Sequence, residues 1–161
     1  MGYGRHNSKK MEDKQPIWQR SIPLETINAY SRNTLLEHLE IRFTEIGPDF
    51  VRATMPVDHR TVQPYGLLHG GANVALAESM GSTASLLCLR DLETEAPVGV
   101  EINANHLRSV TSGTVTATCR PIRVGRKIHV WQIDIHDDAG HLTCVSRLTV
   151  AVVEKRTKAP E

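Results

Sequence analysis

Apolar and polar residues alternate along six segments of the chain, and this period-2 pattern predicts six β-strands. The first two strands are expected at residues 41–47 and 50–57, and the Pro-Asp pair between them indicates a hairpin. The other four are separated by short turns and are expected at residues 98–109, 113–124, 127–138 and 141–154. Clean alternation is typical of strands with one face toward a core and one toward water.

Two segments have helical character instead. Residues 71–89 are rich in Ala, Leu, Met, Glu and Ser, and proline is absent until Pro97, so a long helix is predicted there. This helix is apolar almost all round, as an enclosed helix would be, and its glycines and alanines let neighbours approach closely. Residues 23–39 predict a shorter helix that is interrupted near residues 31–33.

The order of these elements determines the fold class. It contains no repeated β-α-β unit, which disfavours a parallel sheet. The arrangement predicted is α+β, with an antiparallel sheet of about six strands wrapped around one long central helix, the hotdog fold. A chain of 161 residues supports one such domain, expected at residues 16–155, between a disordered extension at residues 1–15 and a flexible tail at residues 156–161.

Composition excludes several classes of function. The formal net charge of +1 gives no basic excess for nucleic acid, and no apolar run is long enough for a membrane span. The N-terminus lacks the apolar core of a secretory signal, so a cytoplasmic protein is expected. Three cysteines without a CxxC pair, and eight histidines without HxxxH or HxH spacing, favour buried thiols over a disulfide or a metal site. Neither a metal nor a cofactor is expected.

Candidate chemistry gathers in residues 63–85, QPYGLLHGGANVALAESMGSTAS. Gly70 stands where the long helix begins, so its N–H is free to stabilise a carbonyl oxygen that gains negative charge. Glu78 is a single carboxylate among small apolar residues, where desolvation would raise its pKa to suit a general base or a nucleophile. Ser82, four residues on, lies within reach of that carboxylate. Gln63 and His69 can both donate hydrogen bonds to a carbonyl.

Each of these residues also has an ordinary structural interpretation. A His-Gly-Gly sequence is often no more than a tight turn into a helix, and a glutamate in a helix often points to solvent. Gln63 and His69, taken singly, are more often loop residues than catalytic ones.

The spacing of the candidates predicts a second subunit. Gly70 and Glu78 are eight residues apart, about 12 Å along one helix at about 1.5 Å per residue. Both cannot act on one carbonyl from the same helix. A two-fold dimer with antiparallel neighbouring helices would bring Gly70 of one subunit to Glu78 of the other, so we expect a homodimer with shared active sites.

The segments PVDHRTVQPYGLLHGGANVALAESMGS, GVEINANHLRS and VWQIDI resemble the hotdog-fold acyl-CoA thioesterases of the 4-hydroxybenzoyl-CoA thioesterase type. The resemblance covers roughly residues 17–154. It is strongest to the bacterial branch that includes 1,4-dihydroxy-2-naphthoyl-CoA thioesterase and the enterobactin-pathway proofreading thioesterase. This chain departs from the pattern in its polar extension and in a longer acidic loop, RDLETEAP.

The resemblance implies a catalytic apparatus without a metal or a triad. Glu78 is implied as nucleophile or general base, Gln63 and the Gly70 N–H as the groups that polarise the thioester carbonyl, His69 as a helper at the same oxygen, and Ser82 as the residue that positions the acid or water. The family also implies homotetramers. Coenzyme A, as part of the substrate, is implied to contact Gly71, Gly99, His106, Leu107, Arg108, Ser109, Arg123, Val124, Gly125, Arg126, Lys127 and Ile128.

The residues leave alternatives open. A hotdog dehydratase or isomerase would also pair a histidine with an acid, and a binding module that senses acyl-CoA is a third class. The partner that carries the acyl group is either coenzyme A or an acyl or aryl carrier protein. The acyl pocket is expected to include Val62, Tyr65, Leu67, Leu68 and Met80, whose apolar side chains accept aromatic and aliphatic groups alike.

Overall fold

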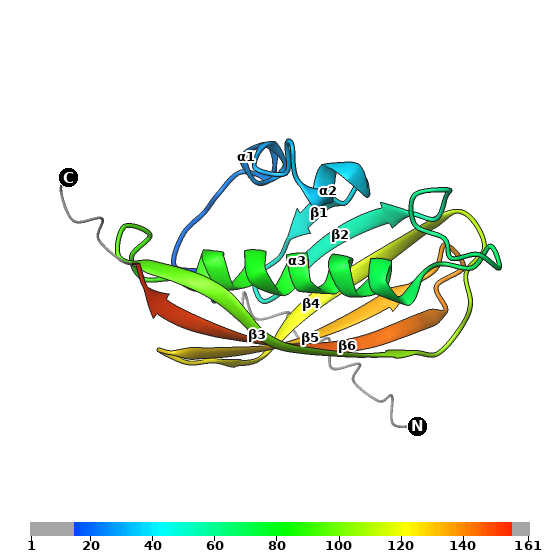
Figure 1. Ribbon diagram of the computed structural model, residues 1–161. Helices are drawn as coiled ribbons and strands as arrows, with labels where there is room; N and C mark the ends of the chain where they lie inside the picture. Colours follow the sequence, from blue (N-terminus) through cyan, green and yellow to red (C-terminus); the bar gives the residue numbers. More distant parts are fainter. Residues whose placement is uncertain (1–14, 156–161) are drawn as a thin grey trace, which may run out of the picture.

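The computed structural model describes residues 15–155, and Figure 1 shows one antiparallel sheet curved around a long helix. Residues 1–14 and 156–161 lie outside the described part, so the expected terminal tails are not described. The helices are α1 (Leu24–Ala29), α2 (Leu35–His38) and α3 (Gly70–Cys88). The strands are β1 (Arg42–Ile46), β2 (Val51–Pro56), β3 (Glu95–His106), β4 (Thr114–Val124), β5 (Ile128–His136) and β6 (Leu142–Glu154). The predicted α+β hotdog fold is confirmed, as is the interruption between α1 and α2.

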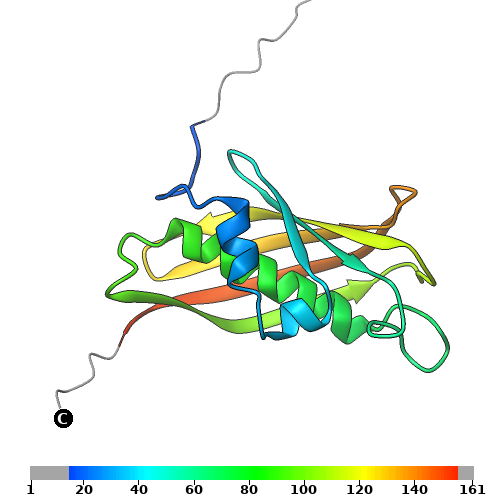
Figure 2. The same ribbon diagram turned by 90° about the horizontal axis from the view of Figure 1, so that it is seen from above.

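The order of strands across the sheet is β1-β2-β4-β5-β6-β3. The short turn predicted after the third strand does not join two neighbouring strands of the sheet. β3 pairs with β6 along its whole length, and β4 pairs with β2 and β5. The chain therefore crosses over between β3 and β4, and β3 becomes an edge strand of the sheet. Figure 2 shows α1 crossing above α3.

The core lies between α3 and the inward side chains of the sheet. Alternate residues of β5 point to this side, and Trp131, Ile133 and Ile135 are completely buried. The helix approaches so closely that a Cβ on Gly81 would overlap the Leu148 side chain of β6. Inside this contact the Trp131 indole N–H donates a 2.7 Å hydrogen bond to Ser85 Oγ. Such a bond satisfies two polar groups that would otherwise destabilise the core.

The long helix is less enclosed than its sequence suggests. Seven of its residues form a partly exposed stripe, which we call the outer stripe of α3: Val74, Ala75, Glu78, Ser79, Ser82, Thr83 and Leu86. Met80 is buried in its own subunit, so its placement in the acyl pocket is wrong. Cys88, Cys119 and Cys144 are free, and their expected burial is confirmed. Among the described residues, no helix is both long and apolar enough to cross a membrane.

Removal of the Ser85 hydroxyl should weaken the core. In Ser85→Ala the buried Trp131 N–H loses its acceptor, so the free energy of unfolding should fall by about 1–3 kcal/mol. Urea unfolding at one fixed protein concentration measures this loss. Ser79→Ala is the matched control, because the Ser79 hydroxyl only bonds Ala75 O within the same helix. Equal losses in the two variants would contradict the importance of the Trp131–Ser85 bond.

Candidate active site

Glu78 lies on the outer stripe of α3, with its side chain half-buried. Ser82 Oγ donates a 3.3 Å hydrogen bond to Glu78 Oε1, as the four-residue spacing predicts. Burial raises the pKa of the Glu78 carboxyl above its ordinary value, and the Ser82 hydrogen bond partly opposes that rise. A carboxylate of this kind is a stronger base than an exposed glutamate, yet part of it is open to a substrate.

The Glu78 carboxylate rests against the backbone of the edge strand β3. A Cβ on Gly99 would overlap Glu78 Oε1, so glycine at this position leaves the space that the carboxylate fills. Gly99 was expected on the path of coenzyme A, whereas the structure places it at the candidate catalytic acid. A glycine inside a strand often marks such a close approach, and this signal was available in the sequence.

The beginning of α3 presents one free backbone donor. Within residues 15–155, no acceptor is bonded to the Gly70 N–H. The Gly71 N–H is different, because it donates a 2.8 Å hydrogen bond to His69 Nδ1. His69 is thus the N-cap of the helix. The Gly71 N–H is therefore occupied within this chain, its contact with substrate stays a prediction, and only Nε2 of His69 is left to face a ligand.

His106 joins this group from the end of β3. A Cβ on Gly70 would lie 2.6 Å from His106 Nε2, so the imidazole packs directly on the start of the helix. His106 Nδ1 is 3.4 Å from the Nδ2 atom of Asn73, a buried residue of α3. Sequence reasoning did not single out Asn73. The one feature of the sequence that could have identified Asn73 is its polar amide on the helix face that points to the core.

Gln63 lies in a tight turn before α3. Its backbone N–H donates to Leu67 O, and its backbone O accepts from Gly66 N–H, both at 2.8 Å. Its side-chain Oε1 accepts from the Tyr65 N–H, which leaves the Nε2 amide group as a donor. Tyr65 itself is 89% exposed and does not line the hollow beside His69.

A shallow hollow of about 310 Å³ opens beside His69. Of the residues expected in the acyl pocket, Val62 lines it, and Leu67 and Leu68 do not. The remaining walls are mostly apolar and come from α2 and its C-cap, the loop between β2 and α3, and the first turns of α3: Leu35, Leu39, Arg60, His69, Gly71, Ala72 and Ala75. This hollow offers space for an apolar group beside the helix start.

The two segments expected to hold coenzyme A lie far apart. Ile128, next to the β4–β5 turn, and Val98 of β3 are both level with Ala151 of β6. His106, the first residue of the segment 106–109, is level with Cys144. Cys144 and Ala151 are seven residues apart along β6. At about 3.3 Å per residue this separation is about 23 Å. Figure 1 shows the β4–β5 turn and the start of α3 at opposite ends of the molecule. The structure of one chain does not bring the segments together.

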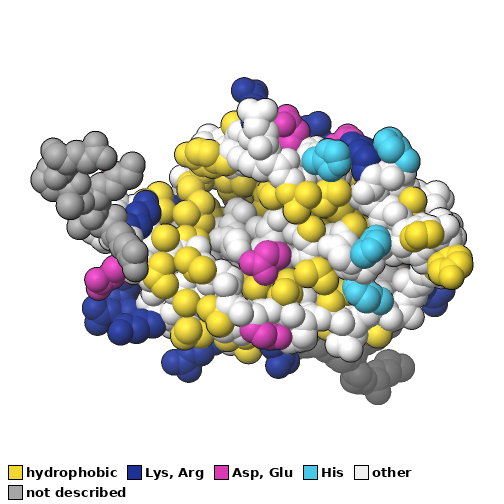
Figure 3. Space-filling model, viewed as in Figure 1, with side chains coloured by type: hydrophobic (Ala, Val, Ile, Leu, Met, Phe, Trp, Pro, Cys, Tyr) yellow, Lys and Arg dark blue, Asp and Glu magenta, His cyan; other side chains and the backbone are white. Residues whose placement is uncertain are grey.

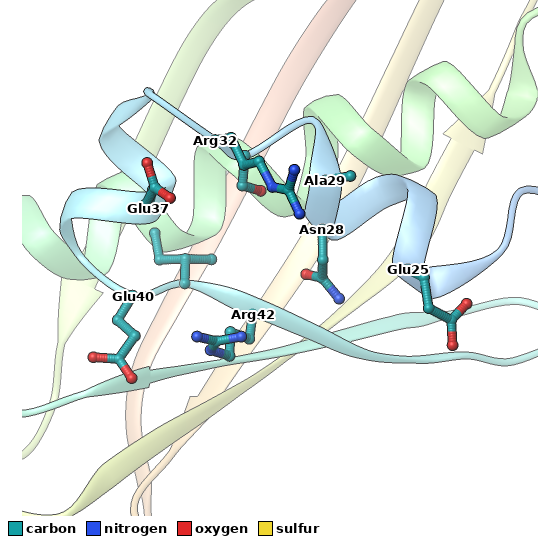
Figure 4. A pocket seen from close by; sticks show the side chains of 9 residues that line it. Glu25, Asn28, Ala29, Arg32, Glu37, Glu40 and Arg42 are labelled. Atoms are coloured by element: carbon teal, nitrogen blue, oxygen red, sulfur yellow. The ribbon is translucent and has the colours of Figure 1, made fainter.

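Figure 4 shows a second, polar hollow of about 300 Å³ between α1, α2 and β1. Several of its polar side chains already have structural partners. Glu37 accepts from the Asn33 N–H, Glu40 pairs with Arg60, and the Asn28 side chain bonds the Phe43 backbone twice. These groups hold the helical segment on the sheet, so the hollow is not assigned to the active site.

Comparison with known proteins identifies the family. Residues 65–144 match the model of the thioesterase superfamily. The chain is 52% identical to the 1,4-dihydroxy-2-naphthoyl-CoA hydrolase of Escherichia coli K12 over 85% of this chain and 99% of that protein. The proofreading thioesterase EntH of Cronobacter turicensis is 50% identical over 85% and 98%, respectively. This chain belongs to the thioesterase superfamily. It is an enzyme that hydrolyses thioesters.

Solved structures of relatives agree with this assignment. A mutant thioesterase PA1618 from Pseudomonas aeruginosa superposes with a TM-score of 0.84 at 49% identity, covering 86% of this chain and 99% of that one. The thioesterase HI1161 from Haemophilus influenzae has a TM-score of 0.84 at 50% identity, covering 89% and 99%. The arrangement of one long helix in a curved sheet is therefore shared with known thioesterases.

Ser82→Ala should change the pH dependence of this thioesterase in a defined direction. A base or nucleophile at Glu78 requires the ionised form, and the Ser82 hydrogen bond favours that form, so its removal raises the Glu78 pKa further. The acid limb of kcat/KM should therefore move to higher pH than in the wild type. Ser79→Ala, one residue from Glu78, should leave the limb in place. A limb that stays fixed or moves to lower pH in Ser82→Ala would contradict this role.

Proposed function

We propose that this thioesterase hydrolyses aroyl- and acyl-CoA thioesters at a site shared by two subunits. Glu78 of one subunit acts on a carbonyl that is polarised by Gln63 and the Gly70 N–H of the partner subunit. One observation carries the proposal. The half-buried Glu78 carboxylate is bonded to Ser82 and packs on the edge strand, and the free Gly70 N–H lies at the start of the same helix.

The chemistry requires few groups, because a thioester carbonyl is electrophilic and a thiolate leaves readily. In one route Glu78 attacks the carbonyl carbon, the C–S bond breaks, and water then hydrolyses the resulting anhydride. In the other route Glu78 takes a proton from water as the water oxygen attacks the same carbon, and the C–S bond then breaks to release the thiolate, which takes up the proton. In both routes negative charge develops on the carbonyl oxygen, where the Gly70 N–H and the Gln63 amide would stabilise it. His69 Nε2 is a further donor near that position.

The edge strand β3 supports the two-subunit arrangement. It has twelve residues, and its outer side leaves backbone N–H and C=O groups without a neighbouring strand. Val98 and Val100 on this strand are 48% and 63% exposed. A long edge with apolar side chains is a template for pairing with another copy. Figure 3 shows hydrophobic side chains spread over the face on which α3 lies, with few charges near its centre.

Pairing of two β3 strands would also resolve the separation of the coenzyme A segments. Around a two-fold axis the strands run antiparallel, so the start of one lies beside the end of the other. Residues 106–109 of one subunit would then approach the β4–β5 turn of its partner. In such a dimer a single substrate could contact both segments. The assembly of two dimers into a homotetramer remains a prediction from the family resemblance. A cytoplasmic location, expected from the sequence of the N-terminus, also remains a prediction.

The acyl group is proposed to be aromatic. The support comes from the apolar hollow beside His69 and from the 1,4-dihydroxy-2-naphthoyl-CoA hydrolase of Escherichia coli, which is 52% identical to this chain. The second candidate substrate is an aroyl group on a carrier protein, which the similarity to proofreading thioesterase EntH favours.

The purified protein should release free thiol from aroyl-CoA esters, and Glu78→Gln should lower kcat by a factor of about 10²–10⁴. Thiol release from dihydroxynaphthoyl-, benzoyl-, β-ketoacyl- and straight-chain CoA esters, together with a benzoyl-loaded carrier protein, ranks the substrates by kcat/KM. Glu25→Gln, the same chemical change at an exposed residue of α1, is the control. A straight-chain ester preferred over both aroyl esters would overturn the aromatic assignment, and full activity in Glu78→Gln would overturn the catalytic one.

Mixed dimers test the shared site. A Glu78→Gln subunit retains Gln63, and a Gln63→Ala subunit retains Glu78, so their heterodimer contains one complete site. Each homodimer should be inactive or nearly so. Mixing the two proteins by denaturation and refolding should restore activity to about one quarter of wild type. This fraction follows because about half of the dimers are mixed and each mixed dimer has one of its two sites complete. Native mass spectrometry of differently tagged subunits verifies exchange. Heterodimers that form and remain inactive would exclude a shared site.

A further inference from the structure

Asn73 is a buried polar residue of α3 that the catalytic scheme does not use. Only 5% of the residue is exposed, and it lies near the start of the helix. Its Oδ1 atom is buried and has no hydrogen-bond partner within residues 15–155. An unpaired amide oxygen inside a protein lowers stability, and asparagine is a poor helix former. Stability therefore does not account for an asparagine at this position.

The amide nitrogen of Asn73 faces a histidine. Asn73 Nδ2 lies 3.4 Å from Nδ1 of His106, the last residue of β3. This distance is long, as is common for contacts in an active site without substrate. An amide NH₂ group can only donate, so the contact is a hydrogen bond when Nδ1 carries no proton. A neutral imidazole then carries its proton on Nε2, and Asn73 thus selects one of the two tautomers of His106.

The Nε2 atom of His106 lies beside the start of α3. A Cβ on Gly70 would be 2.6 Å from Nε2, but 3.1 Å from both Cδ2 and Cε1, so Nε2 is the nearest ring atom. Gly70 and Asn73 are three residues apart, so they lie on one face of the helix and both contact the ring. The proton that Asn73 assigns to Nε2 is therefore next to Gly70, whose own N–H has no acceptor among residues 15–155.

His69 shows the same arrangement with a backbone donor. Its Nδ1 accepts the Gly71 N–H at 2.8 Å, so a neutral His69 also carries its proton on Nε2. Both imidazoles are exposed in the single chain. Donors from α3 thus direct the protons of two histidines to Nε2 at the helix start, where negative charge would develop on the carbonyl oxygen.

We infer that Asn73 is a positioning residue, which holds His106 with its Nε2–H available to the thioester carbonyl oxygen beside the Gly70 N–H. The inference rests on the proposed function, because it assumes that this oxygen binds at the start of α3. Asn73 is buried and touches neither the substrate nor the reacting atoms. It acts only through His106, so its loss should lower kcat and leave KM nearly unchanged.

NMR of protein that contains isotope-labelled histidine tests the tautomer directly. At a pH where the ring is neutral, wild-type His106 should carry its proton on Nε2, and His106→Gln identifies its signal among the eight histidines of the chain. In Asn73→Ala both tautomers should be populated, because no donor then faces Nδ1. A proton on Nδ1 in the wild type, or an unchanged tautomer in Asn73→Ala, would overturn the inference.

Steady-state kinetics with benzoyl-CoA test whether the tautomer matters for turnover. Asn73→Ala should lower kcat about three- to tenfold, as expected for the loss of one hydrogen bond, with KM within about twofold of wild type. His106→Ala should lower kcat by about tenfold or more, because it removes the donor itself. The double variant should be no slower than His106→Ala, since Asn73 then has nothing to position. Losses that multiply in the double variant, or a change in KM alone, would contradict a role through His106.

A conservative variant provides the rescue. His106→Gln keeps an N–H near the position of Nε2 and has no tautomers, so it should retain more activity than His106→Ala. In the His106→Gln protein, Asn73→Ala should change kcat by less than about twofold. A full three- to tenfold loss there would show that Asn73 acts by another route.

Ser85→Ala separates this role from general damage to the helix. It also removes a buried side-chain hydrogen bond of α3, yet its kcat should stay within about twofold of wild type. Asn73→Ala should show the opposite pattern: its urea midpoint should not fall, because an unpaired oxygen is removed and alanine favours the helix. An equal loss of kcat in the two variants would assign the effect to packing and overturn the inference.

The proposed function can fail separately from this inference. Wild-type protein that releases no thiol from any CoA ester would remove the proposed function, whereas the tautomer of His106 is measured without substrate. Normal thiol release with the same kcat in wild type and Asn73→Ala would overturn the inference alone.

Discussion

The close packing of α3 against the inner face of the sheet is the constraint on which the active site depends. Ala77, Gly81 and Ala84 form this contact and are fully or almost fully buried. Larger side chains would hold the helix away from the strands, since a single Cβ on Gly81 already overlaps Leu148. Because the helix lies this close to the sheet, the Glu78 carboxylate on the outer stripe of α3 reaches the backbone of β3 at Gly99. The small residues in the sequence thus fix the position of the acid.

The electrostatics of Glu78 follow from this position. The sheet edge shields one side of the carboxylate from water, and burial is the larger effect on its pKa. The Ser82 hydroxyl acts in the opposite direction and keeps the ionised form accessible. No basic side chain forms an ion pair with Glu78 among residues 15–155, so its charge is not neutralised by a neighbour. A carboxylate in that state remains reactive toward water or a carbonyl carbon.

Local sequence patterns were sufficient to predict the elements of this fold. Alternation identified all six strands, and residue composition located α3 to within one residue at each end. The pairing of β3 with β6 could not be predicted in this way, because hairpin signals describe only neighbours along the chain. Glu78 was singled out as a lone carboxylate among apolar residues, and its contact with Ser82 was predicted from the four-residue helical spacing. The N-cap bond of His69, the burial of Met80 and the contact between Asn73 and His106 depend on tertiary packing, which no local pattern encodes.

Two contacts within one chain constrain where a two-fold axis can pass. Gly70 packs on His106, and Glu78 packs on Gly99, so both ends of the catalytic spacing are tied to β3. If Gly70 of one subunit serves Glu78 of the other, the axis must pass beside α3 at the level midway between them, near Val74. The same axis must pass beside β3 at the level midway between Gly99 and His106, between Ile102 and Asn103. A dimer centred there would place His106 of the partner subunit next to the Glu78–Gly99 contact. The helix spacing and the strand contacts therefore require the same symmetry, although they come from different parts of the fold.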